Sequence, residues 1–474
     1  MKDLREFIDQ VQELGELKVV EGANWEWEMG AITYYMAEQP NPPALLFDKV
    51  KGYPPGFRVF TIPCSTQKRL ALSCEQPVNL DRLELVRALR DKMSQHYKSV
   101  PPVVVKKGPV MENIDTGDEV DLFKFPTPQW QPLDGGRYIG TGDTVITKDP
   151  DEGWVNVGVY RIQIHDKTTA TIFMEPGRHA NIIRRKYWAR GQSCPVAVTL
   201  GGDLLHFNIG TTRIPWGVSE YDYTGWFRGE PMDVIKGPIT GLPIPAHAEI
   251  VLEGEMVPPE VETRVEGPFS EYTGHYSPAR PEPVFRVKSV MYRNDPIILG
   301  ALPYYAAGVP YVPNYLWRAA HVWEELDRIV PGVKGVWIPT EFGSNRAVVI
   351  SLEQKYGGHA QQAALAALAV RGYMQRYVIV VDDDVDPTNL NEVLWAMSYR
   401  AEPEEFEIIR GFWGGTLDPR LSPEKRAAGD FTLSSAIILA VKPYRWMKDF
   451  PVSVKPSLEL REKVKRKWDK KLFP

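Results

Sequence analysis

The sequence predicts an α+β protein of several domains, and three observations support this fold class. Its 474 residues are enough for roughly two to four domains. A composition of 43% apolar and 25% charged residues is ordinary for a globular protein. The pattern of apolar residues also changes twice along the chain. We therefore expect an N-terminal α/β domain (1–115), a strand-rich domain (116–305), a C-terminal α/β domain (306–445) and a helical tail (446–474).

The N-terminal region reads as mixed α/β. A helix is predicted over 2–16 because one apolar stripe repeats at helical spacing, formed by Leu4, Phe7, Ile8, Val11 and Leu14. Two further helices are expected at about 26–38 and 79–96, and strands at 44–47 and 58–62. The turn-rich segment 125–137 marks the end of this region.

Short strands dominate the next region. They are expected at 144–147, 154–165, 169–174, 196–200, 249–253 and 284–292, with helices at about 180–190 and 220–228. A run of short strands with few helices favours an antiparallel barrel or a sandwich.

Helices and strands alternate in the last third of the chain. Helices are expected at about 313–329, 361–370 and 389–399, and strands at 347–352, 377–381 and 435–441. This alternation predicts an α/β layer that contains parallel strands. The tail from 457 to 471 reads as a basic helix with Ser457 as its N-cap.

The net charge and the cysteine content indicate which partners and which cellular compartment to expect. A net charge of −5 gives no case for nucleic acid or an anionic membrane as the main partner. The three cysteines form no metal motif and leave one unpaired, which favours a reduced, cytoplasmic setting. The N-terminus lacks the apolar core of a signal peptide, and no apolar run reaches the ~20 residues of a membrane span.

Reactive side chains concentrate between residues 154 and 271. Asn156, His179 and Glu220 offer an amide oxygen, an imidazole and a carboxylate. Such a set suits a six-coordinate cation such as Mn²⁺ or Mg²⁺ and does not suit structural zinc. The alternative is that each residue is structural, since a lone histidine between strands is more often a satisfied core residue than a ligand.

A second group combines Arg161 with Glu266 and Glu271. The two glutamates flank Gly-Pro-Phe-Ser, a tight turn that could bring both carboxylates to one place. One glutamate held by arginine would stay ionised, while the other could have a raised pKa and carry a proton. The alternative is an ion-pair cluster on the surface. In one continuous strand, Arg161 and Asn156 would face opposite sides unless a bulge intervenes.

Several segments resemble the UbiD family of reversible, prenylated-FMN-dependent (de)carboxylases over nearly the whole chain. The resemblance is based on the segments Asn156–Arg161, His179, Ser219–Pro231, Glu249–Glu255, Glu266–Gly274 and Val380–Pro387. The resemblance is divided about equally between the aromatic-acid and the heteroaromatic-acid branches. It implies a central split β-barrel that binds the flavin, placed between the two α/β domains. It also implies a homodimer or a dimer-based hexamer, with cofactor supplied by a flavin prenyltransferase.

The resemblance also implies roles for single residues. Asn156, His179 and Glu220 match ligands of a divalent metal, usually manganese, and Trp154 with Glu220 matches a potassium site. Thr211 and Thr212 match the segment near phosphate and potassium, and Arg178 matches a cofactor contact. Arg376 stands where the family carries a phosphate-binding lysine, and its planar guanidinium has a different geometry from an ammonium group. Arg161, Glu266 and Glu271 match the catalytic set.

The expected function is reversible decarboxylation of a small aromatic or heteroaromatic acid, with CO₂ as co-product. A side chain cannot hold the electron pair left by CO₂, so the prenylated FMN would act as the electron sink. Arg161 would orient the carboxylate, Glu271 would deliver a proton and Glu266 would hold Arg161. Two alternatives are a metal-dependent hydrolase and a flavin-binding module without catalysis. Tyr304, Tyr305 and Tyr311 are candidates for pocket lining or for core packing.

Overall fold

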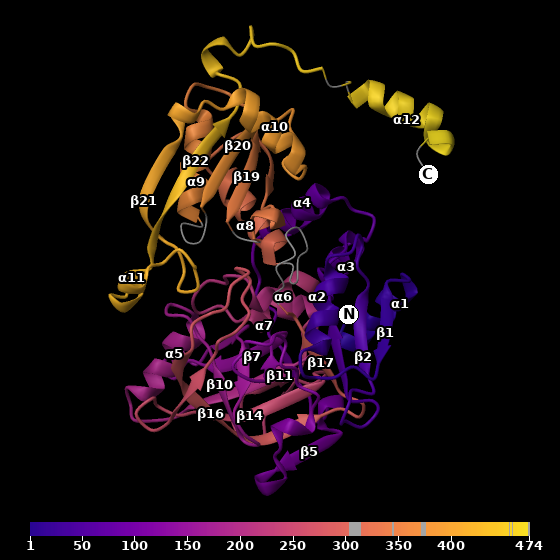
Figure 1. Ribbon diagram of the computed structural model, residues 1–474, viewed down its shortest axis with the longest axis vertical. Coiled ribbons are helices and arrows are strands. Elements are labelled where there is room, and N and C mark those ends of the chain that lie inside the picture. Colours follow the sequence, from indigo (N-terminus) through magenta and orange to yellow (C-terminus); the bar gives the residue numbers. More distant parts are fainter. Residues whose placement is uncertain (303–313, 344–345, 371–375, 455, 457, 473–474) are drawn as a thin grey trace.

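The chain forms three α/β regions and a separate C-terminal helix (Figure 1). The computed structural model describes residues 1–302, 314–343, 346–370, 376–454, 456 and 458–472. Tyr304, Tyr305, Tyr311 and Ser457, for which the sequence predicts roles, lie outside these described residues. Within them, no helix combines the length and the apolar composition that a membrane crossing requires.

The N-terminal region contains a four-stranded sheet. The strand order is β1-β2-β3-β17, and β17 comes from much later in the chain. The elements are α1 (Leu4–Glu13), β1 (Leu17–Glu21), α2 (Glu28–Ala37), β2 (Ala44–Asp48), β3 (Arg58–Thr61), α3 (Gln67–Ser73), α4 (Arg82–Met93) and β17 (Ile297–Gly300). Helix α4 begins at a capping box in which Asp81 and Glu84 satisfy each other's backbone amides.

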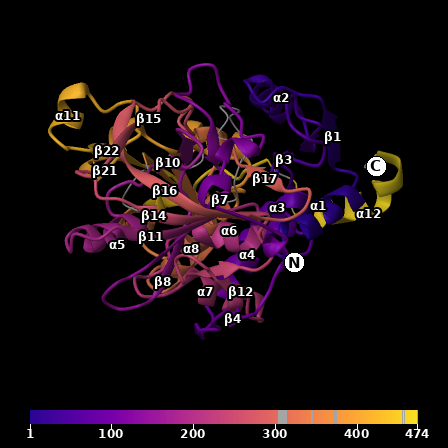
Figure 2. The ribbon, with the colours of Figure 1, turned by 90° about the horizontal axis from the view of Figure 1, so that it is seen from below.

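The central region is built on a ten-stranded sheet in which every pairing between described strands is antiparallel. The path runs β6-β9-β10-β16-β14-β11-β7-β8, and β5 and β15 also pair with β16. In Figure 2 its strands lie between the N-terminal elements on one side and α5 on the other. The strands are β5 (Asn113–Thr116), β6 (Tyr138–Gly140), β7 (Asp143–Lys148), β8 (Val155–Gly158), β9 (Ile162–Ile164), β10 (Thr169–Ile172), β11 (Cys194–Leu200), β14 (Ile250–Met256), β15 (Thr263–Glu266) and β16 (Arg280–Tyr292).

Three helices and a small sheet complete the central region. The helices are α5 (His179–Trp188), α6 (Leu204–Gly210) and α7 (Glu220–Arg228). The small sheet has the order β13-β12-β4, with β4 (Val103–Val104), β12 (Asp233–Lys236) and β13 (Pro243–Pro245). Short 3₁₀ turns occur at Pro109–Met111, Gly117–Glu119 and Leu122–Lys124.

The C-terminal region is a three-layer α/β unit. Its sheet has the order β18-β19-β20-β22-β21, with β19, β20 and β22 parallel and both edge strands antiparallel. Helices α8 and α9, with α4 from the N-terminal region, cover one face, and α10 covers the other. The elements are α8 (Asn314–Asp327), β18 (Val333–Trp337), β19 (Ala347–Leu352), α9 (His359–Val370), β20 (Tyr377–Asp382), α10 (Leu390–Arg400), β21 (Glu407–Trp413), α11 (Pro423–Ala427) and β22 (Thr432–Ala440), with 3₁₀ turns at Thr340–Phe342, Pro403–Glu405 and Tyr444–Trp446.

Helix α12 (Leu458–Leu472) forms the predicted tail and stands clear of the other elements (Figure 1). The predicted domain boundaries stay predictions. Two strands lie across or near them. Strand β5 spans the expected boundary at 115/116 and pairs with β16 of the central sheet. Strand β17 lies inside the expected central domain but pairs with β3 of the N-terminal sheet.

The strand expected at 154–165 is two strands. Strand β8 ends at Gly158 and β9 begins at Ile162, so Arg161 lies in the break between them. The alternation argument that separated Asn156 from Arg161 therefore does not apply, because it requires a continuous strand. Across this break the chain passes from β8, at one end of the strand order, to β9, next to the other end, and Arg161 lies in that crossing.

Candidate active site

Arg161 lies between two buried glutamates. Its Nε and Nη2 donate to the two oxygens of Glu266, both at 2.7 Å, which is a bidentate pair. Its Nη1 donates to Oε1 of Glu271, and Nη2 also reaches Oγ of Ser277 at 3.2 Å. The three charged side chains are 8% exposed or less. The surface ion-pair alternative is therefore wrong, because the cluster is buried.

The turn that carries the two glutamates is fixed by a neighbouring loop. Asp134 accepts hydrogen bonds from the backbone N–H of Ser270 at 2.8 Å and of Gln131 at 2.9 Å. Gly135 donates its N–H to the carbonyl of Pro268 at 2.7 Å. A Cβ atom at Gly135 would stand 2.0 Å from the carbonyl oxygen of Gly267, so only glycine allows this approach. The loop and the turn thus hold Glu271 against Arg161.

The two glutamates have different surroundings. Glu266 also accepts a hydrogen bond from the hydroxyl of Tyr138 at 3.0 Å and has no exposed surface. Burial raises the pKa of Glu271, although the nearby positive charge of Arg161 opposes this shift. For Arg161 itself, burial would lower the pKa, but Glu271 and Glu266 outweigh it and the pKa is raised. The arrangement keeps Arg161 charged, and Glu271 holds its proton to a higher pH than a free glutamate does.

Asn156 and Glu220 meet at the edge of strand β8. Glu220 accepts hydrogen bonds from Nδ2 of Asn156 at 3.0 Å and from the backbone N–H of Val157 at 2.7 Å. Both side chains are 3% exposed, and burial raises the pKa of Glu220 to about 8. The Oδ1 atom of Asn156 is buried and has no hydrogen-bond partner in the described part of the chain. A buried amide oxygen beside a buried carboxylate fits a hard cation, which would supply the missing partner.

His179 is the first residue of α5 and packs among aromatic rings. Its ring lies edge-on to Trp154 at 5.7 Å and to Trp216 at 5.2 Å between centroids. Partial burial and the positive charges of Arg178 and Arg213 lower the pKa of His179. The imidazole is therefore neutral at physiological pH, the form that binds metal ions. Helix α5 and helix α7, which begins at Glu220, both contact β8.

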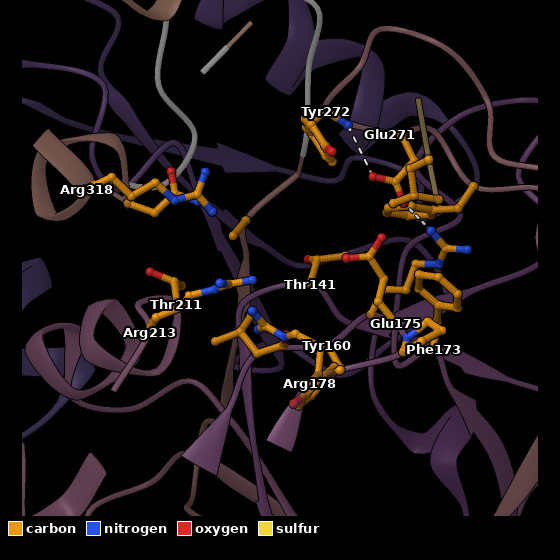
Figure 3. A pocket seen from close by; sticks show the side chains of 18 of the residues that line it. Thr141, Tyr160, Phe173, Glu175, Arg178, Thr211, Arg213, Glu271, Tyr272 and Arg318 are labelled. Atoms are coloured by element: carbon orange, nitrogen blue, oxygen red, sulfur yellow. Dashed lines mark hydrogen bonds and ion pairs between the residues drawn. The ribbon is translucent and has the colours of Figure 1, made fainter. Parts of the chain in front are cut away.

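A cavity of about 630 Å³ lies beside Arg161 and Glu271. Its wall includes residues from the central region and, from the C-terminal region, Asn314, Arg318, Trp413 and Leu417. In Figure 3, Glu271, Glu175 and Phe173 project from one side, and Arg213, Thr211 and Arg318 project from the opposite side. A cavity of this size accommodates a drug-sized or cofactor-sized ligand.

The structure brings most of the predicted site residues to this cavity or next to it. Arg161, Glu271, Arg178 and Thr211 line it directly. Thr212 follows Thr211 and donates its hydroxyl to the carbonyl of Ile209 at 2.7 Å. Arg376 is not among the residues that line the cavity, and its guanidinium binds both oxygens of Asp418 at 2.8 Å.

Several lining residues were not predicted from the sequence. They are Thr141, Phe173, Glu175, Arg213, Phe269, Tyr272, Arg318, Trp413 and Leu417. The guanidinium of Arg161 lies 4.2 Å from the ring centroid of Phe173 and 5.2 Å from that of Phe269. For Phe173, the sequence offered one indication of a place in the site: it follows a strand directly and precedes the Pro-Gly turn. Arg318 is on α8, and no local pattern connects that helix to the cavity.

The buried ion trio at the wall of a large cavity is the arrangement of an enzyme with an acid–base site. Three family models match the chain. They are the 3-octaprenyl-4-hydroxybenzoate carboxy-lyase N-terminal domain at residues 8–93, the Rift-related domain at 103–305 and the C-terminal domain at 314–439. The chain belongs to the UbiD family of carboxy-lyases.

Curated relatives and solved structures agree with this assignment. Pyrrole-2-carboxylic acid decarboxylase of Pseudomonas aeruginosa is 32% identical, over 90% of this chain and 89% of the relative. Vanillic acid decarboxylase of Sedimentibacter hydroxybenzoicus, solved in open and closed forms, has 29% identity and a TM-score of 0.84 in the open form, with 99% of both chains covered. HmfF of Pelotomaculum thermopropionicum, solved with FMN, has 27% identity and a TM-score of 0.83, over 96% of this chain and 98% of that one. The three-domain fold and the carboxy-lyase class expected from the sequence are confirmed.

Proposed function

We propose that this protein catalyses the reversible, non-oxidative decarboxylation of an aromatic or heteroaromatic carboxylic acid with prenylated FMN as cofactor. One observation carries the proposal: a buried arginine, held by one glutamate and touching a second, stands at the wall of a cofactor-sized cavity. The relatives are decarboxylases of pyrrole-2-carboxylic and phenolic acids, and a UbiD-class structure holds prenylated FMN.

The side of the cavity opposite Glu271 is suited to binding the cofactor phosphate. Arg178, Arg213 and Thr211 line it, and Arg318 adds a further guanidinium from the C-terminal region. Arg376 does not line the cavity, and its Nη2 donates to both oxygens of Asp418 at 2.8 Å. We therefore propose that Arg178, Arg213 and Arg318 bind the phosphate and that Arg376 contributes less to binding it.

A divalent cation, Mn²⁺ or Mg²⁺, would be held by Asn156, His179 and Glu220. The support is the Oδ1 atom of Asn156, which is buried beside a fully buried carboxylate and accepts no hydrogen bond from a described residue. Glu220 and the backbone carbonyl of Trp154 would hold K⁺, with Thr211 and Thr212 nearby. Oxygen and imidazole ligands of this kind match hard divalent cations.

Arg161 and Glu271 have separate tasks in the proposed reaction. Loss of CO₂ leaves an electron pair on the ring carbon, for which the bound prenylated FMN supplies the electron sink. Arg161 orients the substrate carboxylate by exchanging its hydrogen bond to Glu271 for one to the substrate. Glu271, whose pKa is raised by burial, then gives its proton to the carbon that lost CO₂. In the carboxylation direction the Glu271 carboxylate takes that proton back.

We further propose a cytoplasmic homodimer or dimer-based hexamer, which receives its cofactor from a flavin prenyltransferase. Three buried, free cysteines agree with a reducing compartment.

The test combines cofactor analysis with isotope exchange. The protein is co-expressed with a flavin prenyltransferase, the bound flavin is released and weighed by mass spectrometry, and ¹³C-bicarbonate exchange is measured across aromatic and heteroaromatic acids. We expect the mass of prenylated FMN and label in at least one acid. A colourless preparation with full hydrolytic activity would support the metal-dependent hydrolase instead. Bound flavin without any exchange would support a binding module without catalysis.

A further inference from the structure

A hydrogen-bonded contact joins the central and C-terminal regions beside the cavity. Oε1 of Glu175 accepts the hydroxyl of Thr416 at 2.6 Å and the backbone N–H of the same residue at 3.3 Å. Glu175 lines the cavity, and so do Trp413 and Leu417, which lie close to Thr416 in the chain. We call the pair of hydrogen bonds between Glu175 and Thr416 the closure contact.

The C-terminal side of the closure contact is rigidly braced. Arg426 of α11 donates to the carbonyls of Thr416 at 2.6 Å, Asp418 at 2.5 Å and Leu421 at 3.2 Å. Asp418 in turn binds Arg376 at 2.8 Å and Arg346 at 3.0 Å, next to strands β20 and β19. These contacts tie the loop that carries Thr416 to the C-terminal sheet.

The central side is braced as well. Nδ2 of Asn181, in the first turn of α5, donates to the carbonyls of Met174 at 2.7 Å and Glu175 at 3.3 Å. The backbone N–H of Arg178 also donates to the carbonyl of Glu175, at 3.3 Å. Because both partners are fixed to their own region, the closure contact can form only when the two regions have one defined separation.

We propose that Glu175 and Thr416 are positioning residues which hold the C-terminal region closed over the cavity, and that Glu175 links this closure to the proton carried by Glu271. The second part rests on the proposed function. The link follows from geometry, since Glu175 and Glu271 line the same side of one cavity (Figure 3). Closure by this contact would bring Trp413 and Leu417 to the cavity and exclude water from it.

The charge on Glu175 also acts on Glu271. The charged groups that bear on Glu271 are Arg161, which lowers its pKa, and Glu175 and Glu266, which raise it. Removal of the charge on Glu175 should therefore make Glu271 release its proton at lower pH. Loss of the Thr416 hydroxyl leaves the Glu175 charge in place, so it should lower the pKa of Glu271 only through loss of burial, and by less than removal of the charge together with the contact.

The closure contact is tested by a distance measurement that requires no turnover. Spin labels are placed at cysteines introduced by Gln192→Cys and Glu404→Cys, both at exposed positions, because the three native cysteines are buried. Labelled protein is diluted with unlabelled protein so that only distances within one chain are read. Thr416→Val should shift the ratio of the short to the long distance roughly tenfold toward the long one, as expected for a hydrogen bond to a charged group.

Thr416→Ser keeps the hydroxyl and is the matched control, with a distance distribution like that of the unmodified protein. Thermal unfolding of each variant checks that the fold is intact. An unchanged distribution in a folded Thr416→Val protein overturns the closure contact.

The link to Glu271 is tested by the pH profile of kcat/KM in the cofactor-loaded enzyme. Both variants should lower the rate, and Glu175→Gln should move the alkaline limb further to lower pH than Thr416→Val does, because it removes a negative charge as well as the contact. A limb that moves no further in Glu175→Gln than in Thr416→Val overturns the link. If no acid is decarboxylated at all, the proposed function fails, while the distance measurement still decides the closure contact.

Discussion

The arginines on the two sides of the cavity differ in burial. Arg161 is buried, and its guanidinium is bonded to Glu266, Glu271 and Ser277. On the opposite side Arg213 is exposed and Arg318 is half-buried, although both line the cavity (Figure 3). In the candidate metal site, the buried Oδ1 of Asn156 accepts no hydrogen bond from a described residue.

This difference indicates which part of the site the protein completes by itself. The Arg161 trio is assembled by side chains alone, and groups positioned before substrate binds need no reorganisation during reaction. The cation-rich side and the candidate metal site would be completed by a ligand. The same chain thus combines a preorganised acid–base site with an anchor that a phosphate and a metal ion would finish.

The largest expected effect is on turnover. Glu271→Gln removes the proton donor while keeping the size of the side chain, so kcat should fall by about 10²- to 10⁴-fold. Flavin absorbance of the purified variant should match that of the unmodified protein, because the anchor lies on the other side. Normal turnover in this variant would remove Glu271 from the role of general acid.

Arg161→Met and Arg213→Met should separate the two sides by stability. Arg161→Met leaves the fully buried Glu266 without its partner, which should cost about 3–5 kcal/mol of unfolding free energy. Arg213→Met changes an exposed side chain, so stability should stay within about 0.5 kcal/mol while flavin retention falls. Urea unfolding of the cofactor-free proteins measures the first effect. Equal stability losses in both variants would contradict the distinction.

Metal binding should stabilise only a protein with an intact anchor. Mn²⁺ at a hundred times its dissociation constant should raise the unfolding free energy by about 2.7 kcal/mol. Asn156→Ala should lose most of this gain, whereas Asn113→Ala, on strand β5, should keep it. The gain is compared within each variant by thermal unfolding with and without Mn²⁺. An undiminished gain in Asn156→Ala would argue against a metal at this place.

The smallest effect concerns Asp134, which holds the turn of Glu271. Burial raises the pKa of Asp134 to about 6, so the folded protein binds this proton more tightly than the unfolded chain. Its contribution to stability is therefore fully present below about pH 4 and is lost as the pH rises through about 6. Relative to Asp134→Asn, the unmodified protein should lose roughly 1–3 kcal/mol between pH 4 and 7. Urea unfolding across this range measures the difference, and a constant difference would refute the assignment.

The sequence could predict features that depend on local pattern. The glutamates at 266 and 271 flank a short turn, so their meeting followed from turn chemistry. The three regions followed from the changing spacing of apolar residues. The short strands of the central sheet were expected for the same reason.

Features that depend on distant pairing could not be predicted in this way. Strand β17 is a short apolar run that would fit either sheet, and only tertiary packing pairs it with β3. The break between β8 and β9 has no proline or other breaker at Val159–Arg161. The contact between Glu175 and Thr416 spans 241 positions, and nothing in either local sequence indicates the other residue. Arg213 and Arg318 meet at the cavity for the same non-local reason.

We propose that a cation-anchored flavin occupies this cavity with Arg161 at its reactive end. The most direct measurement is anomalous diffraction at the manganese edge from crystals grown with prenylated FMN and Mn²⁺. We expect an anomalous peak within coordination distance of Oδ1 of Asn156, together with flavin density between Arg161 and Arg213. A manganese peak elsewhere, or flavin density outside the cavity, would contradict it.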